Sequence, residues 1–296
     1  MFFDLFQDGK FLGGCFGSQN ENGTRHLGSG REKGMGMLRR RGWMGLGIVG
    51  LMGLMGGLGV EEAKAGDRRF TYVYEAGPFT PGEVEIENWV TFKTTKDSDP
   101  HFTRFEFRHE IEIGITEQLG VAFYLADWRY QDGAKVENDG IEYRNSAVEV
   151  IYNFTNPTVD PLGFSLYGEY KGGPELHELE GKVLLQKNID QWVIAYNVFV
   201  EAEWEQEDGG WEDVGVVGQT VGVSYQVTPA FLVGGELVHE IELPGWSDAE
   251  DSVVYVGPNA SYRGQQWFVT VTPLFQVTNV EGEPNFQTRV IFGFHF

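Results

Sequence analysis

The sequence predicts an all-β fold: an antiparallel up-and-down transmembrane β-barrel of twelve strands, preceded by a cleaved signal peptide. Three observations predict it. Segments of roughly ten residues after Gly66 alternate apolar and polar side chains at the period of a strand. The links between them alternate between tight turns and longer polar loops. No segment beyond Gly66 repeats its apolar residues at the helical period.

The composition limits the classes of function. The chain has 296 residues, 41 of them Gly, with 14% aromatic residues and a formal net charge of −22. This acidity argues against nucleic acid as a partner, because phosphates bind to basic surfaces, and it is compatible with a cation-attracting lumen. Cys15 is the one cysteine, so the sequence allows no intrachain disulfide and no thiolate metal site.

The N-terminal region has the order of a secretory signal: a basic stretch, an apolar stretch and a small-x-small cleavage site. The alternative is a transmembrane helix, but frequent Gly weakens both the hydrophobicity and the helix propensity of the apolar stretch. The three parts are 39–41, 43–60 and Ala63-Lys64-Ala65, with Gly66 as the first mature residue.

The predicted organisation has four parts. Residues 1–36 are Gly-rich and irregular and are interpreted as a non-native or dispensable extension, with Met1, Met35 or Met37 as the translation start. Residues 37–65 are the signal peptide. Residues 66–83 are expected as a periplasmic segment and residues 84–296 as the barrel.

The first three strands show the pattern best. Residues 84–92 place Val84 and Ile86 opposite Glu85 and Glu87. Residues 104–115 read RFEFRHEIEIGI, with a charged residue at nearly every second position. A helix would spread these charges around its circumference, whereas a strand puts them on one face. Residues 119–130 begin with the same alternation, and their later half indicates a change of face or a bulge.

The other nine strands follow from the same alternation. Residues 192–205 give one of the longest patterns, with Trp192, Ile194 and Tyr196 on one face, and residues 179–186 give the weakest. The nine strands are predicted over 147–154, 162–170, 179–186, 192–205, 220–227, 231–243, 253–262, 267–277 and 286–296.

The connections differ in length at the two ends of the predicted strands. Links after even-numbered strands are mostly short, such as TPA and RGQQ, and several after odd-numbered strands are longer, such as QDGAKVENDG and QEDGGWEDVG. Short turns at one end and longer loops at the other are typical of an up-and-down barrel.

A soluble barrel or sandwich is the alternative architecture. Twelve strands enclose a lumen too wide to fill with aliphatic side chains, which favours an apolar face pointing outward. Aromatic residues near strand ends favour the same arrangement, because Trp and Tyr gather at membrane interfaces. The aromatic residues in question are Trp89, Trp128, Tyr130, Tyr152, Tyr170, Trp192, Trp204, Tyr225, Tyr262 and Trp267.

The chain ends in RVIFGFHF, which places Val290, Phe292, Phe294 and the terminal Phe296 on one strand face. This ending resembles the β-signal of Gram-negative outer-membrane β-barrel proteins, and together with the signal peptide the resemblance to porin-like barrels covers residues 37–296. It implies an outer-membrane location, contact with outer-membrane lipid, and a barrel-assembly machinery that reads the last strand. It implies location and fold rather than function.

The face opposite the apolar one is expected to line the lumen, because charges facing hydrocarbon are costly. An acidic lining favours cations or small polar solutes, so we expect a passive pore. A plugged barrel, whose basic residues pair with the glutamates, and an adhesive barrel stay open as alternatives. The expected pore-lining residues are Glu85, Glu87, Arg104, Glu106, Arg108, Glu110, Glu112, Glu149, Glu201, Glu203, Glu236, Glu240, Glu242 and Arg289.

An enzyme is not expected, and a lipid-modifying activity is the lesser alternative. His109 and His239 fall on the apolar face, but no Ser lies beside either in the sequence to act as a nucleophile. No cofactor is expected, because the chain has no P-loop, no dinucleotide fingerprint and no nucleophile elbow. No metal site is expected, since the His residues lack ligand spacing and the acidic stretches 208–215 and 247–252 match no calcium loop.

Overall fold

The computed structural model describes residues 68–136, 140–207 and 210–296. The signal peptide, its cleavage site at Ala63, Ala65 and Gly66, and the extension 1–36 lie outside these residues, so they stay predictions. No helix within the described ranges is long and apolar enough to cross a membrane.

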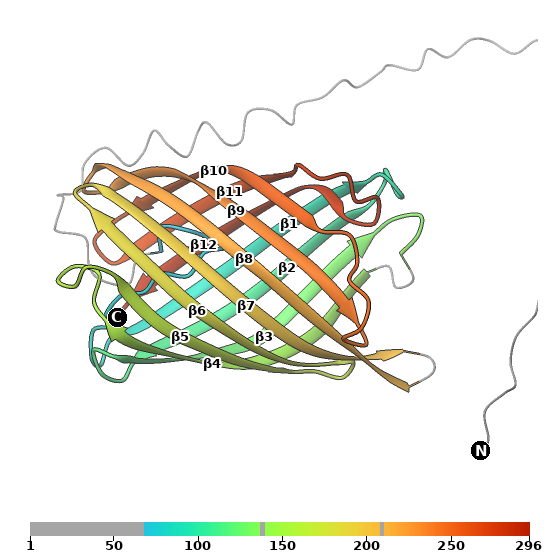
Figure 1. Ribbon diagram of the computed structural model, residues 1–296, viewed down its shortest axis with the longest axis horizontal. Helices are drawn as coiled ribbons and strands as arrows, with labels where there is room; N and C mark the ends of the chain where they lie inside the picture. The colour runs from blue at the N-terminus through green and yellow to red at the C-terminus, as the bar shows by residue number, and fades with distance from the viewer. Residues whose placement is uncertain (1–67, 137–139, 208–209) are drawn as a thin grey trace, which may run out of the picture. The chain divides into compact units, whose positions relative to one another are not determined.

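Twelve strands close into one antiparallel barrel, in which each strand pairs with its neighbours in sequence and β1 pairs with β12 (Figure 1). Each predicted strand is present, and several extend further than predicted. The strands are β1 Val84–Lys96, β2 Thr103–Gly114, β3 Leu119–Asp132, β4 Gly140–Thr155, β5 Gly163–Gly172, β6 Leu176–Ile189, β7 Trp192–Glu207, β8 Gly210–Thr228, β9 Phe231–Pro244, β10 Val253–Arg263, β11 Trp267–Gln276 and β12 Pro284–His295.

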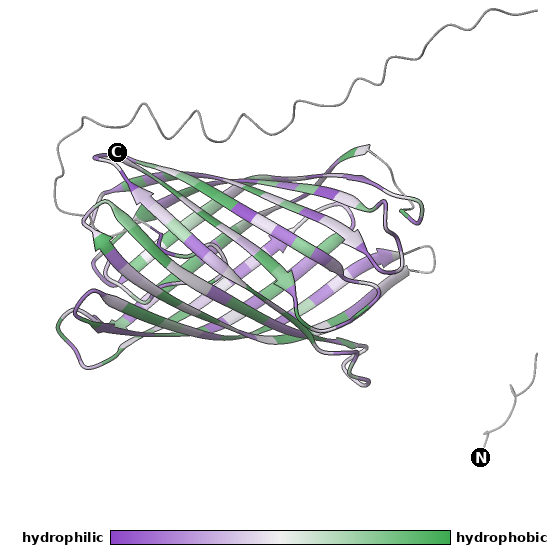
Figure 2. Cartoon of the chain, turned by 90° about the horizontal axis from the view of Figure 1, so that it is seen from above, coloured by the Kyte–Doolittle hydropathy of each residue, from purple (hydrophilic) through white to green (hydrophobic). Residues whose placement is uncertain are grey.

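The barrel has its apolar residues outside and its polar residues inside, the reverse of a soluble barrel. On β4, Val150 is 42% exposed whereas its neighbour Glu149 is 1% exposed. On β7, Val198 is 44% exposed and Asn197 is 1% exposed. Figure 2 shows the resulting alternation of hydrophobic and hydrophilic residues along the strands. The predicted transmembrane-type barrel is therefore confirmed as the fold.

The predicted irregularity in the third strand is also present. The register shifts between His109 and Glu110 on β2 and again between Tyr124 and Trp128 on β3. A bulge returns the side chains after Asp127 to the required faces, so that Arg129 points inward again.

Aromatic side chains form a band near each end of the strands. At the end that carries the C-terminus, called the turn end, Trp192 packs against Tyr225 and Trp267 packs against Phe292, with the rings tilted in both pairs. At the opposite end, called the loop end, Phe92 packs on Phe105. Further ring pairs at the turn end are Phe154–Phe164 and Tyr262–Trp267, and at the loop end Trp128–Tyr143, His177–Trp211 and Phe275–Phe286.

Trp89 is the exception among the aromatic residues expected at the interfaces. It is 4% exposed and lies inside the barrel, because it shares the inward face of β1 with Glu87 and Thr91. Its indole N–H donates a hydrogen bond to Glu87 Oε2 over 2.6 Å.

The connections at the loop end are shorter than predicted. The stretch 206–215, expected as a loop, belongs largely to β7 and β8, which extend to Glu207 and from Gly210. Residues 245–252 and 277–283 remain true connections. Short tips of this kind offer little surface to a partner, which weakens the adhesive alternative.

β12 closes the barrel. Its register with β1 pairs Phe294 with Ile86 and Val290 with Val90. Beyond the last strand residue, the Phe296 N–H donates to the Val84 carbonyl over 2.9 Å, and the Val84 N–H donates to the Phe296 carbonyl over 3.3 Å. The chain end is therefore part of the wall.

Candidate functional site

Residues 68–77, called the plug segment, run inside the barrel wall. They form the blue end of the described chain in Figure 1. Phe70, Tyr74 and Ala76 are all buried. The sequence placed residues 66–83 in the periplasm as a segment ahead of the barrel. The structure instead places residues 68–77 inside the lumen, where they share the interior with the predicted pore-lining residues.

One carboxylate holds three consecutive backbone N–H groups of the plug segment. Glu236, on β9, accepts hydrogen bonds from the N–H groups of Thr71 at 2.8 Å, Tyr72 at 2.7 Å and Val73 at 3.2 Å. Thr272 donates its hydroxyl to the same carboxylate. Such charge-assisted bonds are among the stronger ones in proteins, so Glu236 acts as a latch.

Inward amide side chains complete the backbone pairing of the plug segment. Asn197 accepts from the Tyr74 N–H at 2.7 Å and donates to the Tyr74 carbonyl at 3.0 Å, as a neighbouring strand would. Gln186 accepts from the Ala76 N–H at 2.9 Å. Buried backbone groups need such partners, and these two side chains supply them from β6 and β7.

The guanidinium of Arg68 lies among carboxylates and rings. Arg68 Nε is 2.7 Å from Glu87 Oε1, and Arg68 Nη2 is 3.5 Å from Glu110 Oε1. The same group lies 4.8 Å from the ring centres of both Tyr74 and Trp89. The carbonyl of Arg68 accepts hydroxyl bonds from Ser261 and Thr270.

The plug segment lies between two cavities. The cavity on the loop side, called the outer cavity, has a volume of about 390 Å³, and the one on the turn side, called the inner cavity, about 300 Å³. Tyr74 lines both. The lumen is thus divided at the level of Tyr74.

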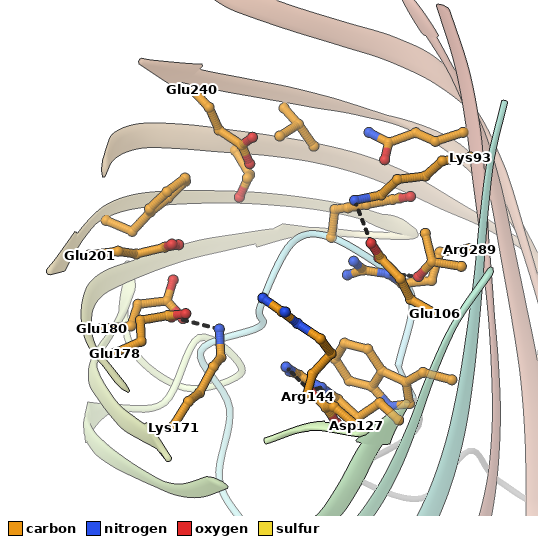
Figure 3. Close-up of a pocket in the computed structure, with 18 of the residues that line it drawn as sticks. Lys93, Glu106, Asp127, Arg144, Lys171, Glu178, Glu180, Glu201, Glu240 and Arg289 are labelled. Carbon is orange, nitrogen blue, oxygen red and sulfur yellow. Dashed lines mark hydrogen bonds and ion pairs between the residues drawn. The ribbon is translucent and has the colours of Figure 1, made fainter. Parts of the chain in front are cut away.

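The outer cavity carries its charges on opposite walls. Most of its bases come from β12 and β1 to β5, among them Lys93, Arg144 and Arg289, and most of its glutamates come from β6, β7 and β9. Asp127 on β3 and Lys182 on β6 are exceptions. Figure 3 shows Glu178, Glu180, Glu201 and Glu240 on one side, with Lys93 and Arg289 across from them. Lys171 Nζ reaches Glu178 at 2.6 Å and Lys93 Nζ reaches Glu106 at 3.1 Å.

The predicted pore-lining residues all come from the inward strand faces, but they fall into different places. Three carboxylates expected in the pathway, Glu110, Glu149 and Glu236, are buried and contact the plug segment. The others divide as follows: Glu106, Arg108, Glu201, Glu240 and Arg289 line the outer cavity, Glu85, Glu87 and Glu112 line the inner cavity, and Arg104, Glu203 and Glu242 lie nearer the loop end. Their role in permeation stays a prediction.

The residues of the expected assembly signal lie where the alternation put them. Phe294 and Phe296 are exposed on the outer face, while His295 is 3% exposed and points inward, 3.2 Å from Glu85. Arg289 also points inward and donates to the Thr71 carbonyl. Recognition of this strand by an assembly machinery stays a prediction.

The amides that hold the plug segment were not among the predicted site residues. Asn153, Gln186, Asn197 and Asn259 sit at inward strand positions, yet nothing nearby in the sequence marks them as partners of residues 68–77. The one signal in the sequence was that these inward strand positions carry an uncharged amide, whereas comparable positions on other strands carry Glu.

On the outer face, the structure brings a Ser to one of the two candidate histidines. His239 Nε2 lies 2.7 Å from Ser252 Oγ, and its Nδ1 lies 3.1 Å from the side-chain nitrogen of Gln219. The Gln219 oxygen accepts from the Tyr196 hydroxyl. His239 Nε2 is thus within hydrogen-bond distance of a hydroxyl, and its Nδ1 faces an amide where a Ser-His-Asp triad has a carboxylate.

His109 has a different neighbour. Its Nδ1 lies 2.8 Å from Asn88 Oδ1 on the adjacent strand. Of the two histidines, His239 therefore has a hydroxyl within hydrogen-bond distance, whereas the partner given for His109 is an amide oxygen.

Residues 62–290 match the model of a family described as "Family of unknown function (DUF6662)". No curated protein matches the chain.

Among solved structures, the chain is similar to the COG4313 outer membrane channel from Pseudomonas putida F1, with 13% identity, 75% of this chain and 98% of that chain covered, and a TM-score of 0.58. It is also similar to the NanC porin, with 9% identity, 70% and 97% covered, and a TM-score of 0.49. The KdgM porin in complex with disordered oligogalacturonate matches with 11% identity, 72% and 98% covered, and a TM-score of 0.43. At this identity, the likeness to the COG4313 channel shows the shared barrel fold.

Proposed function

Because the chain belongs to the family of unknown function DUF6662, we infer its function from the side chains and cavities of its own lumen. We propose that it is a passive outer-membrane channel. The channel would pass small polar solutes, cationic ones included, and the plug segment would gate its path. The single observation that carries this proposal is a polar lumen divided into two cavities by one short stretch of chain.

The hydrogen bonds that hold the plug segment fit a movable gate better than a fixed element of the core. Its backbone is bound by side chains and not by a strand ladder, with Glu236 and Asn197 supplying the contacts described above. A small number of such bonds holds the segment, each with a net free energy of about 0.5–3 kcal/mol, the larger values belonging to the charged acceptor Glu236. Displacement of the segment would join the two cavities.

The outer-membrane location is part of the same proposal. It is supported by the apolar outer face, by the two aromatic bands, and by a fold shared with an outer membrane channel. Membrane fractionation of cells expressing the chain tests it, with the outer-membrane fraction expected to hold the folded protein.

Conductance in planar bilayers tests the gate. The purified wild-type protein is expected to show small, cation-selective steps, and a variant lacking residues 68–77 is expected to show several-fold larger ones. Conductance that is unchanged by the deletion would remove the plug segment from the path.

The alternative function is a plugged structural barrel. Ion pairs between inward side chains favour it, such as Arg108 on β2 with Asp127 on the neighbouring strand β3 at 2.8 Å. Its signature in the same experiment is a wild-type protein without conductance at any voltage, combined with a deletion variant that conducts steadily.

A lipid-modifying enzyme has a separate test. The amide of Gln219 faces His239 Nδ1 where a catalytic triad has a carboxylate, so a mixed-micelle phospholipase assay is expected to show no turnover. Turnover that disappears in Ser252→Ala and persists in His109→Ala would restore the enzyme hypothesis.

A further inference from the structure

A row of glutamates runs across the inner wall at matched strand positions. Glu85 on β1 pairs with Glu112 on β2, and Glu112 pairs with Ala122 on β3. Ala122 pairs with Glu149 on β4, which pairs with Glu169 on β5. The row continues through Glu180 on β6 to Glu201 on β7. It therefore extends along the wall from the inner cavity, past the plug segment, to the outer cavity.

Like charges at directly paired positions repel each other, and burial increases the cost. A second pair of directly opposed glutamates, Glu87 and Glu110, lies at the next inward position of β1 and β2. Both residues are 1% exposed. Cations beside such carboxylates, or protons on them, offset this repulsion.

Toward β5 to β7, lysines supply those cations. Lys171 bridges Glu169 at 3.2 Å and Glu178 at 2.6 Å, and Lys182 lies 2.8 Å from Glu180. The carboxylate clusters on that side thus hold a resident ammonium group.

Toward β1 to β4 the balance differs. The described ion pairs bring Arg68 to Glu87 and Glu110, and His295 to Glu85, but none joins Glu112 or Glu149 to a base. Glu149 instead accepts hydroxyl bonds from Tyr124 and Tyr74.

Three of these carboxylates converge. Oxygen atoms of Glu110, Glu112 and Glu149 all lie within 4.8 Å of one another. The Oε2 atom of Glu110 is buried and has no hydrogen-bond partner among the described residues. The residue between Glu112 and Glu149 in the row is Ala122, whose small side chain leaves the space between the two carboxylates open.

We propose that Glu110, Glu112 and Glu149 bind one divalent cation, Ca²⁺ or Mg²⁺, on the inner wall beside the plug segment. Three carboxylates with no nitrogen or sulfur donor form the ligand set that hard cations prefer. The ion would offset the repulsion within the row and would join β2 to β4 across β3. The site requires the folded barrel and does not depend on conduction.

Terbium luminescence tests the site directly. The hydroxyl of Tyr124 bonds to Glu149, so a Tb³⁺ ion bound there lies next to an aromatic donor that can excite it. With the chelator-treated full barrel in detergent, we expect saturable, tyrosine-sensitised emission that Ca²⁺ displaces. Glu112→Gln and Glu149→Gln are each expected to weaken the binding by about tenfold or more, because affinity at such sites follows the number of charged ligands.

The matched control is Glu106→Gln, on the same strand as Glu110 but paired with Lys93. It is expected to leave Tb³⁺ affinity within about twofold of wild type, since a group outside the ligand set contributes little charge to it. A second readout is thermal unfolding. Ca²⁺ is expected to raise the Tm of the wild type but not the Tm of Glu112→Gln. Without metal, Glu112→Gln is expected to unfold at the same Tm as the wild type or at a higher one. Absence of saturable emission, or equal affinity in Glu112→Gln and the wild type, would overturn the site.

Discussion

At the scale of single residues, inward side chains take the place of a neighbouring strand for the plug segment. Glu236 accepts three backbone N–H groups, and the amide of Asn197 pairs with both backbone groups of Tyr74. Each of these contacts couples a residue of the wall to a residue more than a hundred positions earlier in the chain.

Glu236→Ala is expected to release the plug segment. It leaves three buried N–H groups without an acceptor, and each such group costs about 1–3 kcal/mol. Released residues 68–77 become open to trypsin after Arg68 and Arg69, which can be followed by mass spectrometry of the N-terminus. Glu240→Ala, two positions along the same strand face and without a bond to the segment, is the control. Equal cleavage in both variants would show that Glu236 is not a latch.

Asp99 gives a pH-dependent contact between two connections at the loop end. Its carboxylate accepts backbone N–H bonds from Lys135 at 3.0 Å and from His101 at 3.1 Å. The bond from Lys135 is the main cause that lowers the pKa of Asp99 below its ordinary value. The charged form is therefore the one that the folded loops stabilise.

Because the pKa of Asp99 is lower in the folded protein than in the unfolded chain, charged Asp99 stabilises the folded loops. This stabilisation is complete above the ordinary Asp pKa of about 3.9 and is lost as the pH falls through the lower pKa of the folded state. Protection of the Lys135 amide from hydrogen exchange is expected to hold from pH 7 to pH 4 and to decline only below that. Asp99→Asn is expected to show weaker protection at pH 7 and no further loss in acid. Loss of wild-type protection already at pH 5 would contradict this assignment.

At the scale of elements, the last strand is fixed at both edges. β12 pairs with β1 and β11, and the backbone of Phe296 exchanges two hydrogen bonds with Val84. Close packing inside the wall supports it, because a Cβ at Gly293 would lie 2.2 Å from the Phe268 ring. A glycine is required where an inward ring covers the backbone.

Deletion of Phe296 is expected to impair barrel formation far more than the conductance of molecules that do fold. The deletion removes both bonds to Val84 and leaves the β1 edge partly unpaired, which destabilises closure. The heat-modifiable, folded fraction on gels measures the effect, in cells and after refolding in detergent. Phe296→Tyr, which keeps the backbone bonds and the ring, serves as the control. Equal folded fractions in the deletion and the wild type would refute this role.

At the scale of the whole molecule, the barrel separates two environments by strand alternation alone. Apolar side chains lie outside between the aromatic bands, and the charged side chains lie inside. Around the outer cavity most of the bases lie on β12 and β1 to β5, and glutamates from β6, β7 and β9 face them.

This sorting predicts the selectivity of the path. Glu240 lines the acidic wall of the outer cavity, and Glu240→Gln is expected to reduce the cation preference, seen as a smaller reversal potential in a salt gradient. Glu110→Gln is expected to act in the same direction. The effect should fade at high salt, because screening weakens the field of wall charges. An unchanged reversal potential in both variants would exclude these carboxylates from the path.

The sequence by itself determined the strand count, the two faces and the inward position of the predicted pore-lining residues. The physical reason is that the side-chain period of a strand is two residues, so short segments reveal their faces locally. Glu85, Glu110 and Phe294 could be assigned to a face from their immediate neighbours. The loop lengths were less certain, because the extension of β7 and β8 depends on pairing between the two strands.

Only the tertiary structure decided what occupies the lumen. The entry of residues 68–77, the inward place of Trp89 beside Arg68, and the approach of Ser252 to His239 all join positions that are distant in sequence or lie on different strands. No local period encodes such contacts, since they depend on barrel closure and on register between strands. The sequence determined which face each residue takes, and closure of the barrel decided which residues meet across it.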